Sequence, residues 1–216
     1  MLSRNKIAQP KITMNISISK DLESDSRLQI GEIIGKGTER VCFAHKNNPN
    51  RCYKVSNKSH SKQTRREIKY FQYLKKKQKF PSFMPKFYAA YESGNYFIIE
   101  QDLLINNDNY CYLTLRDFLL QASNSDISIL EEKLEELKKE MLALNIITCD
   151  MRTTNIMVEL KDNILNQIYI FDGYGAPEML HLPNYLPLLG RWKIRRQWKK
   201  FQRYYQQDLQ KRSSQK

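Results

Sequence analysis

The chain has 216 residues, of which 41% are hydrophobic and 27% are charged, and it contains 13 Tyr and 9 Phe. This composition is typical of a folded protein and excludes an intrinsically disordered chain. With 36 Lys and Arg against 23 Asp and Glu, the net charge of +13 favours anionic partners, which are nucleotide phosphates, nucleic acid or an acidic membrane surface. Charge alone does not choose among these partners.

The cysteines and the apolar runs indicate in which cellular compartment the protein is expected. The four cysteines form no C-x-x-C pair, so we expect no zinc site. Cys42 and Cys52 could face each other across a hairpin, although reduced, buried thiols are the state that we expect. No apolar run approaches the ~18 residues of a membrane span, and the N-terminus lacks the apolar core of a signal peptide. These features predict a cytoplasmic protein of a bacterium-like cell.

The first half of the chain predicts an antiparallel sheet with one helix. Residues 1–26 show no sustained hydrophobic period and are expected to form a flexible leader, with Met14 as an alternative start. The expected strands are short apolar runs bounded by turn residues, and they cover residues 28–34, 41–44, 52–55, 86–91 and 96–100. Between the third and fourth of these, residues 63–74 predict an amphipathic helix.

A glycine turn separates the first two expected strands. Gly35 and Gly37 lack Cβ atoms, which would let backbone N–H groups approach phosphates, whereas the alternative is an ordinary hairpin turn. Arg40 stands where a third glycine of a kinase loop is usual. We therefore expect a loop that is stiffer and more positive than usual.

Lys54 lies between Tyr53 and Val55 in the third expected strand, where alternation could point it into a cleft. An inward ammonium group needs a counter-charge, because burying it unpaired is costly. Glu67 shares one face of the following helix with apolar residues and offers that charge. Alone, Glu67 would be interpreted as a surface residue; together, the two predict the ion pair that positions ATP phosphates in kinases.

The second half predicts a linker followed by helices. Residues 100–109 carry few regular signals and are the expected hinge between two lobes. Thr114 is an expected N-cap of a helix over 115–120, and residues 129–144 predict an amphipathic helix. That helix presents one apolar stripe, which is expected to be core, formed by Leu130, Leu134, Leu137, Met141 and Leu144.

The chemistry is expected where this helix ends. Asp150 follows an apolar run, Asn155 comes five positions later, and Asp172 is followed by glycine. In kinases this order supplies the carboxylate that faces the hydroxyl acceptor and two oxygen ligands for Mg²⁺, so we expect Asn155 and Asp172 to hold the metal. Arg152 occupies the position where kinases often carry a Lys that stabilises the transferred phosphoryl group. A hairpin over 156–171 would bring Asn155 and Asp172 together.

Each motif has a plain structural alternative, since polar turn residues and a strand-ending Asp-Gly are common. Six elements in kinase order are not common, and they comprise the glycine turn, Lys54, Glu67, Asp150, Asn155 and Asp172. We expect an α+β, reduced two-lobed protein-kinase-like fold, in which the N-lobe is an antiparallel sheet plus one helix and the C-lobe is mainly helical. The expected divisions are a flexible leader (1–26), the N-lobe (27–105), the C-lobe (106–210) and a flexible tail (211–216).

Four stretches of the sequence carry a family resemblance, and they are IGKGTERVCF (34–43), RCYKV (51–55), RREIKY (65–70) and NI (155–156). Together they resemble the YrbL family, bacterial proteins of the PhoP regulatory network with a protein-kinase-like fold. The resemblance covers roughly residues 28 to 205. It implies a compact two-lobed domain, related more broadly to lipopolysaccharide sugar kinases and RIO-type kinases.

Three features depart from the kinase pattern. Thr148 replaces the usual His of H-R-D, and Gly173-Tyr174 follows the expected metal ligand Asp172 where Phe-Gly is usual. No activation segment of normal length is present, and the A-P-E signature at 176–178 comes too early to be functional. These departures are compatible with nucleotide binding and argue against protein substrates.

Residues 188–205 are aromatic on one helical side and basic elsewhere. This pattern indicates the closing helix of the C-lobe, a docking surface for anionic lipid headgroups or acidic partners, or both.

Two functions follow from the sequence. The first is an ATP- and Mg²⁺-dependent phosphotransferase acting on an unidentified protein or small-molecule acceptor, with a cytoplasmic location that extends to the inner membrane surface. The second is a pseudokinase-like regulatory protein that binds nucleotide or a partner without transfer. Nucleic-acid binding is not expected, because it rests on the charge alone.

Overall fold

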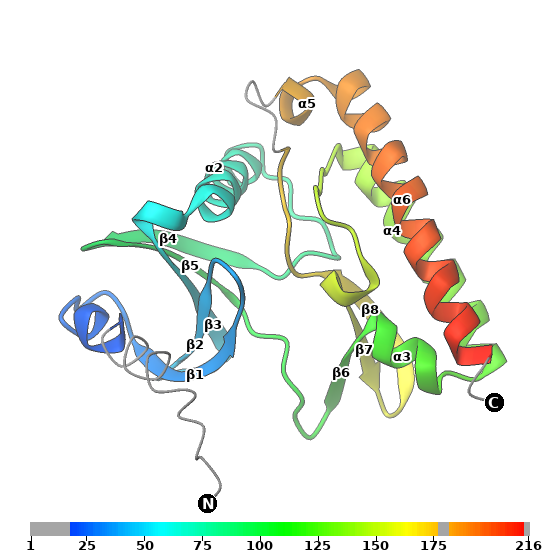
Figure 1. Cartoon of the computed structure of the whole chain (residues 1–216), viewed down its shortest axis with the longest axis horizontal. Helices are drawn as coiled ribbons and strands as arrows, with labels where there is room; N and C mark the ends of the chain where they lie inside the picture. Colours follow the sequence, from blue (N-terminus) through cyan, green and yellow to red (C-terminus); the bar gives the residue numbers. More distant parts are fainter. Residues whose placement is uncertain (1–17, 177–181, 214–216) are drawn as a thin grey trace, which may run out of the picture.

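The computed structural model describes residues 18–176 and 182–213. The expectations for residues 1–17, including Met14, for Pro177 and Glu178, and for residues 214–216 fall outside the described residues. The described chain folds into two lobes joined by an extended linker (Figure 1).

The N-lobe is a five-stranded antiparallel sheet that carries one helix. The strand order is β1-β2-β3-β5-β4, and the neighbours β3 and β5 pair without a register shift. The elements are β1 (Ile30–Lys36), β2 (Val41–His45), β3 (Asn48–Asn57), the short 3₁₀ helix η1 (Lys58–His60), α2 (Lys62–Lys76), β4 (Phe87–Ser93) and β5 (Tyr96–Asp102). Because Tyr70, Phe71 and Leu74 lie on one face of α2, that face packs on the sheet, where the Phe71 and Phe87 rings are 5.1 Å apart.

The end of the expected leader is folded. Residues 18–23 are helical, and Leu22 is fully buried in an apolar cluster with Phe43 and Ile98. The Tyr96 hydroxyl donates to Asp21 over 3.0 Å. No hydrophobic period is visible here because these six helical residues bury only one leucine. The apolar cluster around Leu22 contains no buried residue of α2.

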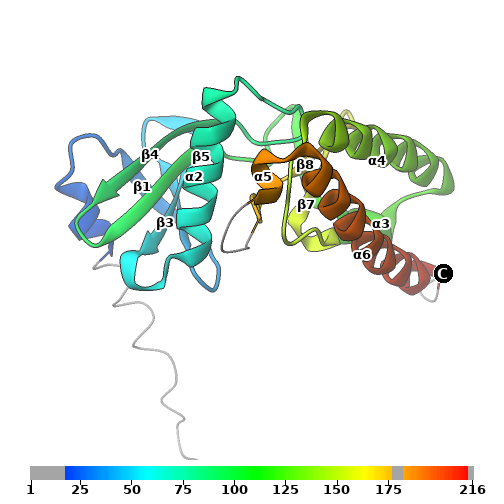
Figure 2. The ribbon, with the colours of Figure 1, turned by 90° about the horizontal axis from the view of Figure 1, so that it is seen from above.

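The C-lobe combines a three-stranded antiparallel sheet with helices (Figures 1 and 2). Its elements are β6 (Tyr110–Thr114), α3 (Leu115–Gln121), α4 (Asn124–Leu144), the 3₁₀ helix η2 (Thr153–Asn155), β7 (Ile156–Lys161), β8 (Ile164–Ile170), α5 (Leu182–Tyr185) and α6 (Pro187–Ser213). The strand order is β6-β7-β8. Strand β6 was not expected, since its five residues are all half-buried and lack an alternating pattern.

The helix ends follow local capping chemistry. Thr114 accepts a hydrogen bond from the Asp117 backbone and caps α3, as expected. Helix α4 begins five residues before the expected position because Ser123 and Asp126 form a capping box. Its expected stripe is buried except for Leu144, which is half-buried. Helix α6 continues to Ser213, so the first residues of the expected tail are helical.

The structure is therefore the expected α+β arrangement, with an antiparallel N-lobe and a mainly helical C-lobe. The larger core joins α2 of the N-lobe to the C-lobe helices and the β6-β7-β8 sheet. Within the described ranges, no helix has the length and apolar character needed to cross a bilayer.

Shortening Leu22 tests whether residues 18–23 belong to the N-lobe. Leu22→Ala should lower the free energy of unfolding by about 2–3 kcal/mol, near the low end for a buried leucine because this terminal segment can shift into the cavity. Urea denaturation would measure the change, with Leu188→Ala as the matched control, since Leu188 is 81% exposed. Equal stability of the two variants would mean that the segment adds nothing to the lobe.

Candidate functional site

Asp150 and Asn155 lie in one loop at the start of the β7-β8 hairpin. The apolar run before the loop is anchored in the core, where Ile146 and Ile147 are fully buried. The Asn155 side-chain amide donates to the backbone oxygen of Asp150 over 3.0 Å and to its Oδ2 over 3.1 Å. Arg152 Nε lies 2.7 Å from Asp150 Oδ1, and both side chains remain about half exposed, at 52% and 41%. The Asp150 carboxylate is thus oriented by two neighbours and open to solvent.

Helix α6 holds the same loop from behind. The buried Thr153 hydroxyl donates to Asp208 of α6 over 2.6 Å. Arg152 stacks over the Tyr204 ring, also on α6, at 5.7 Å from its centroid. The loop therefore has a fixed position relative to α6, which the sequence did not indicate.

The β7-β8 hairpin returns the chain from Asn155 to Asp172, as expected. Ile156 pairs with Ile170, and the Phe171 N–H donates to the Asn155 carbonyl over 3.2 Å. Gly173 has φ +82°, and a Cβ there would lie 3.2 Å from the Asp150 nitrogen. Only glycine fits this close approach at a positive φ without strain. The glycine after Asp172 therefore serves the contact between the two Asp-bearing segments.

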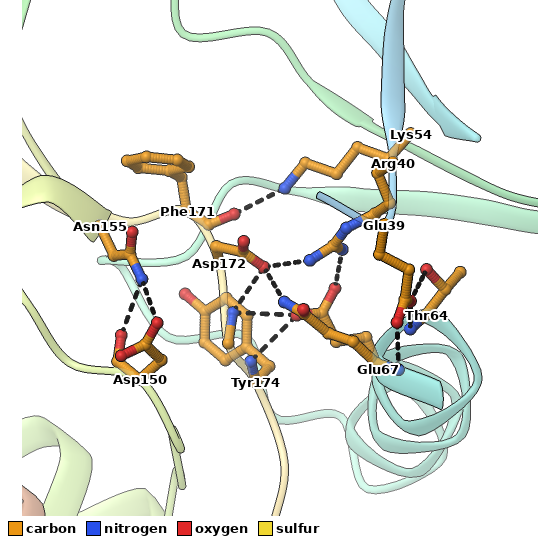
Figure 3. Close-up of polar contacts among 12 residues, drawn as sticks. Glu39, Arg40, Lys54, Thr64, Glu67, Asp150, Asn155, Phe171, Asp172 and Tyr174 are labelled. Atoms are coloured by element: carbon orange, nitrogen blue, oxygen red, sulfur yellow. Dashed lines mark hydrogen bonds and ion pairs between the residues drawn. The ribbon is translucent and has the colours of Figure 1, made fainter. Parts of the chain in front are cut away.

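Arg40 joins three parts of the site (Figure 3). Its guanidinium donates from Nη1 to Glu67 of α2 and from Nη2 to Asp172. Arg40 and Glu67 are only 7% and 1% exposed. Burial alone would raise the pKa of Asp172, but the charges of Arg40 and Lys54 outweigh it and hold that pKa below its usual value.

The expected ion pair between Lys54 and Glu67 is not formed. Lys54 instead donates from Nζ to the Phe171 carbonyl over 2.6 Å, next to Asp172. The other Glu67 oxygen accepts the backbone N–H groups of Gly173 (2.9 Å) and Tyr174 (3.2 Å). Arg40 takes the pairing because its planar guanidinium can bridge two carboxylates at once, whereas an ammonium is a single point charge.

Glu39 fastens the glycine turn to α2. The Ser61 side chain makes no cap on this helix, and Glu39 replaces it by accepting the Thr64 N–H over 2.8 Å and the Gln63 N–H over 3.1 Å. A carboxylate is favourable at a helix N-terminus. The turn itself is closed by the Gly37 N–H, which donates to the Arg40 carbonyl over 2.8 Å. Neither Glu39 nor Arg40 was expected among the site residues, although Arg40 stood out as a charge in a glycine position.

A small apolar cavity lies between the lobes, beside Lys54. Its volume is about 170 Å³. The walls come from the N-lobe strands, the linker and the β7-β8 hairpin, and they comprise Ile34, Cys42, Cys52, Lys54, Gln101, Asp102, Leu103, Leu104, Met157 and Phe171. All four cysteines are free, and burial raises the pKa of the Cys52 thiol to about 12. The thiols at this cavity are therefore neutral, apolar wall groups.

The residues at the bottom of the cleft fit a magnesium ion held with nucleotide phosphates. Because the Asn155 amide nitrogen donates to Asp150, its oxygen points away from Asp150 (Figure 3). Asp172 accepts hydrogen bonds from Arg40, Gln63 and Gly173 through Oδ1, so its Oδ2 remains available to a metal ion. Two oxygen donors suit Mg²⁺, which usually takes one or two protein ligands and keeps its other positions for phosphates and water. In residues 18–176 and 182–213, no cluster of three His, Cys, Asp or Glu residues forms a metal site.

The two lobes and the order of their elements define a protein-kinase-like fold. The structure is similar to that of Rad53 residues 1–466 in complex with AMP-PNP, with a TM-score of 0.52 and 15% identity. The match covers 85% of this chain and 50% of the Rad53 chain, so this protein spans about half the length of that chain.

Within that fold, the chain belongs to the family described as PhoP regulatory network protein YrbL, whose model matches residues 27–206. It is 26% identical to YrbL of Escherichia coli (strain K12) over 179 residues, which cover 81% of this chain and 85% of the relative. YrbL of Shigella flexneri matches to the same extent. The resemblance inferred from the sequence is confirmed.

Replacing Arg40 tests its bridging position. Arg40→Met should lower the free energy of unfolding by about 3–5 kcal/mol, because Glu67 would be left buried without its counter-charge. The double variant Arg40→Met/Glu67→Gln should recover most of this loss. Urea denaturation at pH 7 would measure both.

Arg27→Met is the control, because Arg27 is exposed and pairs with Asp25 on the surface; we expect little change there. A comparable loss in the Arg27 and Arg40 variants, or no recovery in the double variant, would contradict the bridging role.

Proposed function

We propose that this protein is an ATP- and Mg²⁺-dependent phosphotransferase that acts on a hydroxyl group, within the PhoP regulatory network of a bacterium. The observation that carries the proposal is that Asn155 hydrogen-bonds to Asp150 and meets the backbone of Phe171, the residue before Asp172, whose carbonyl accepts from Lys54 at the wall of the interlobe cavity. Asp172 uses only Oδ1 in its hydrogen bonds, and Asn155 uses only its side-chain nitrogen, so Asp172 Oδ2 and the Asn155 side-chain oxygen remain for a metal ion.

The nucleotide would occupy the cleft with its base in the apolar cavity. The walls near Ile34 and Met157 suit an aromatic ring. The backbone of Leu104 would meet its polar edge, since the N–H groups of Asp102 and Leu103 already donate to Lys86 and Asn50. Lys54 and the turn at Gly35 and Gly37 would meet the phosphates. A Cβ atom could be added at either glycine without a close contact. Packing within the protein therefore does not require glycine at these two positions.

The acceptor hydroxyl would lie against Asp150. As its oxygen attacks the γ-phosphorus, the bond from that phosphorus to the bridging oxygen of ADP breaks, and the hydroxyl proton passes to the Asp150 carboxylate. Arg152 would stabilise charge on the transferred group. Bound Mg²⁺ would neutralise phosphate charge at Asn155 and Asp172.

The acceptor is a small molecule or an envelope-linked hydroxyl rather than a peptide. Only nine residues separate Asp172 from α5, which begins at Leu182, and this length is too short for the segment on which kinases bind peptides. The half-exposed Asp150 is compatible with a compact acceptor that enters from solvent. We place the reaction in the cytoplasm, where ATP is available and where the four free cysteines remain reduced.

One observation favours a second function, that of a pseudokinase-like regulator. Arg40 engages both Glu67 and Asp172, so the acidic groups that serve a kinase already have a counter-charge. A protein of this kind would bind nucleotide or a partner without transferring phosphate.

Nucleotide binding is tested by thermal unfolding. Mg-ATP at roughly a hundredfold excess over its Kd should raise the Tm by about 5–10 °C, since ligand binding stabilises the folded state by mass action. Asp172→Asn should remove most of the part that depends on Mg²⁺. The matched control is Asp162→Asn, the same change at the exposed turn of the β7-β8 hairpin. If Mg-ATP leaves the wild-type Tm unchanged, both functions that bind nucleotide fail.

Phosphate transfer is tested by turnover. Wild type should release ADP from ATP or phosphorylate itself, and Asp150→Ala should reduce the rate by about 10²-fold or more while keeping the thermal shift. The assay follows ADP production and transfer of labelled γ-phosphate. Stabilisation by Mg-ATP without any transfer would favour the regulatory function instead, and equal turnover in both proteins would exclude Asp150 from the chemistry.

A further inference from the structure

The surface around α5 and the start of α6 is unusually apolar for an exposed region. Its large side chains are 42–81% exposed, with Leu188 at the upper limit and Trp192 at 59%. We call this surface the α5–α6 patch, and it consists of Leu182, Tyr185, Leu186, Leu188, Leu189 and Trp192. Contiguous exposed apolar side chains of this kind mark interaction sites, because their exposure to water is unfavourable.

Basic residues continue the patch along the same outward stripe of α6. Helix α6 turns Ile194, Trp198 and Phe201 into the core. The opposite stripe begins with Leu188 and Trp192 and continues with basic residues as far as Arg203. Its next exposed charged members are Arg195, Arg196, Lys199 and Arg203. The outward face is therefore apolar at its first turn and cationic over the following turns.

These basic groups are available for an anionic partner. Helix α6 has one acidic residue, Asp208, and that residue is buried against Thr153. Across residues 18–176 and 182–213, no carboxylate forms an ion pair with Arg195, Lys199 or Arg203. Arg196 contacts the Trp192 ring at 4.7 Å, so the charge and the apolar patch adjoin directly.

Helix α2 borders the patch on its other side. The Tyr185 ring packs edge-on against Tyr73 of α2, with 4.9 Å between the ring centroids. Lys69 and Lys76, at i−4 and i+3 from Tyr73, lie on the same face of α2 and are exposed. The apolar patch is thus flanked by cations of two elements.

We propose that the α5–α6 patch and the basic stripe of α6 dock the protein on an anionic lipid bilayer. Leucines would enter the boundary between headgroups and acyl chains, Trp192 and Tyr185 would lie at headgroup level, and the Arg and Lys side chains would meet lipid phosphates. Nucleic acid could pair with the basic side chains, but it would not remove the exposed leucines from water. Helix α6 runs along the outer edge of the C-lobe, where a flat bilayer could approach it (Figure 1).

The two tryptophans make the test specific. Trp192 is exposed on the patch, whereas Trp198 is 4% exposed and faces the core. We expect the full chain to sediment with vesicles of equimolar phosphatidylcholine and phosphatidylglycerol but not with phosphatidylcholine alone. Binding should shift the fluorescence emission to the blue, and Trp192→Phe should remove that shift while sedimentation persists. Added salt should weaken binding.

Paired variants separate the two contributions. Arg195→Gln/Lys199→Gln and Leu188→Ser/Leu189→Ser should each reduce vesicle partitioning by about tenfold or more. The control Lys46→Gln/Lys161→Gln removes the same charge from exposed positions on other hairpins and should change it little. Thermal unfolding would confirm that all three variants fold.

Three outcomes would overturn the proposal. In the first, sedimentation with vesicles falls equally in the control variant and in the α6 variants. In the second, wild type binds vesicles without a blue shift of its fluorescence. In the third, the protein does not bind vesicles but binds single-stranded RNA through Arg195 and Lys199. Either of the first two outcomes would mean that vesicle binding comes from the net charge of +13 and not from this surface.

Discussion

The guanidinium group of Arg40 lies between two carboxylates that the chain supplies from positions 67 and 172. Glu67 is on α2 of the N-lobe and Asp172 follows the last strand of the C-lobe, while Arg40 itself ends the glycine turn. One buried cation therefore fixes the turn, the helix and the lower lobe relative to one another. Because a buried charge is tolerated only when it is paired, removing Arg40 would leave Glu67 buried without a counter-charge and Asp172 without its ion pair. The geometry of the cleft depends on this triad.

The triad also changes what its neighbours do. Since Arg40 satisfies Glu67, Lys54 extends to the Phe171 carbonyl and adds its charge next to Asp172. Two cations then face two carboxylates, so the cleft is close to neutral before any ligand enters. Phosphates bound there would meet Lys54 and Arg40 at one wall and Asp172 beneath. This balance is compatible with a catalyst and with a regulator, and phosphate transfer is what distinguishes them.

Much of the fold could be predicted from local patterns, because the strands of the N-lobe, the stripe of α4 and the capped start of α3 each bury a face at a regular spacing. The meeting of Asn155 and Asp172 was also predictable, since a hairpin must return the chain to its start. The partner of Glu67 was not, because the sequence offers two cations, Lys54 and Arg40, and only the direction of the turn decides between them. Strand β6 was not predicted because its five residues are all half-buried, and so its sequence shows no alternation of apolar and polar side chains.

Helix α6 lies between the Asp150 loop and the outer surface that carries the basic stripe. Its inner face binds the loop of Asp150 through the hydrogen bond from Thr153 to Asp208, and Arg152 of that loop stacks on Tyr204. Its outer face carries the basic stripe. Because a packed helix moves as a unit, a bilayer bound to the outer face would fix the orientation of the Asp150 loop relative to the membrane. An acceptor hydroxyl on a lipid-linked molecule would then approach Asp150 from a defined side, whereas a freely diffusing acceptor would gain nothing from docking.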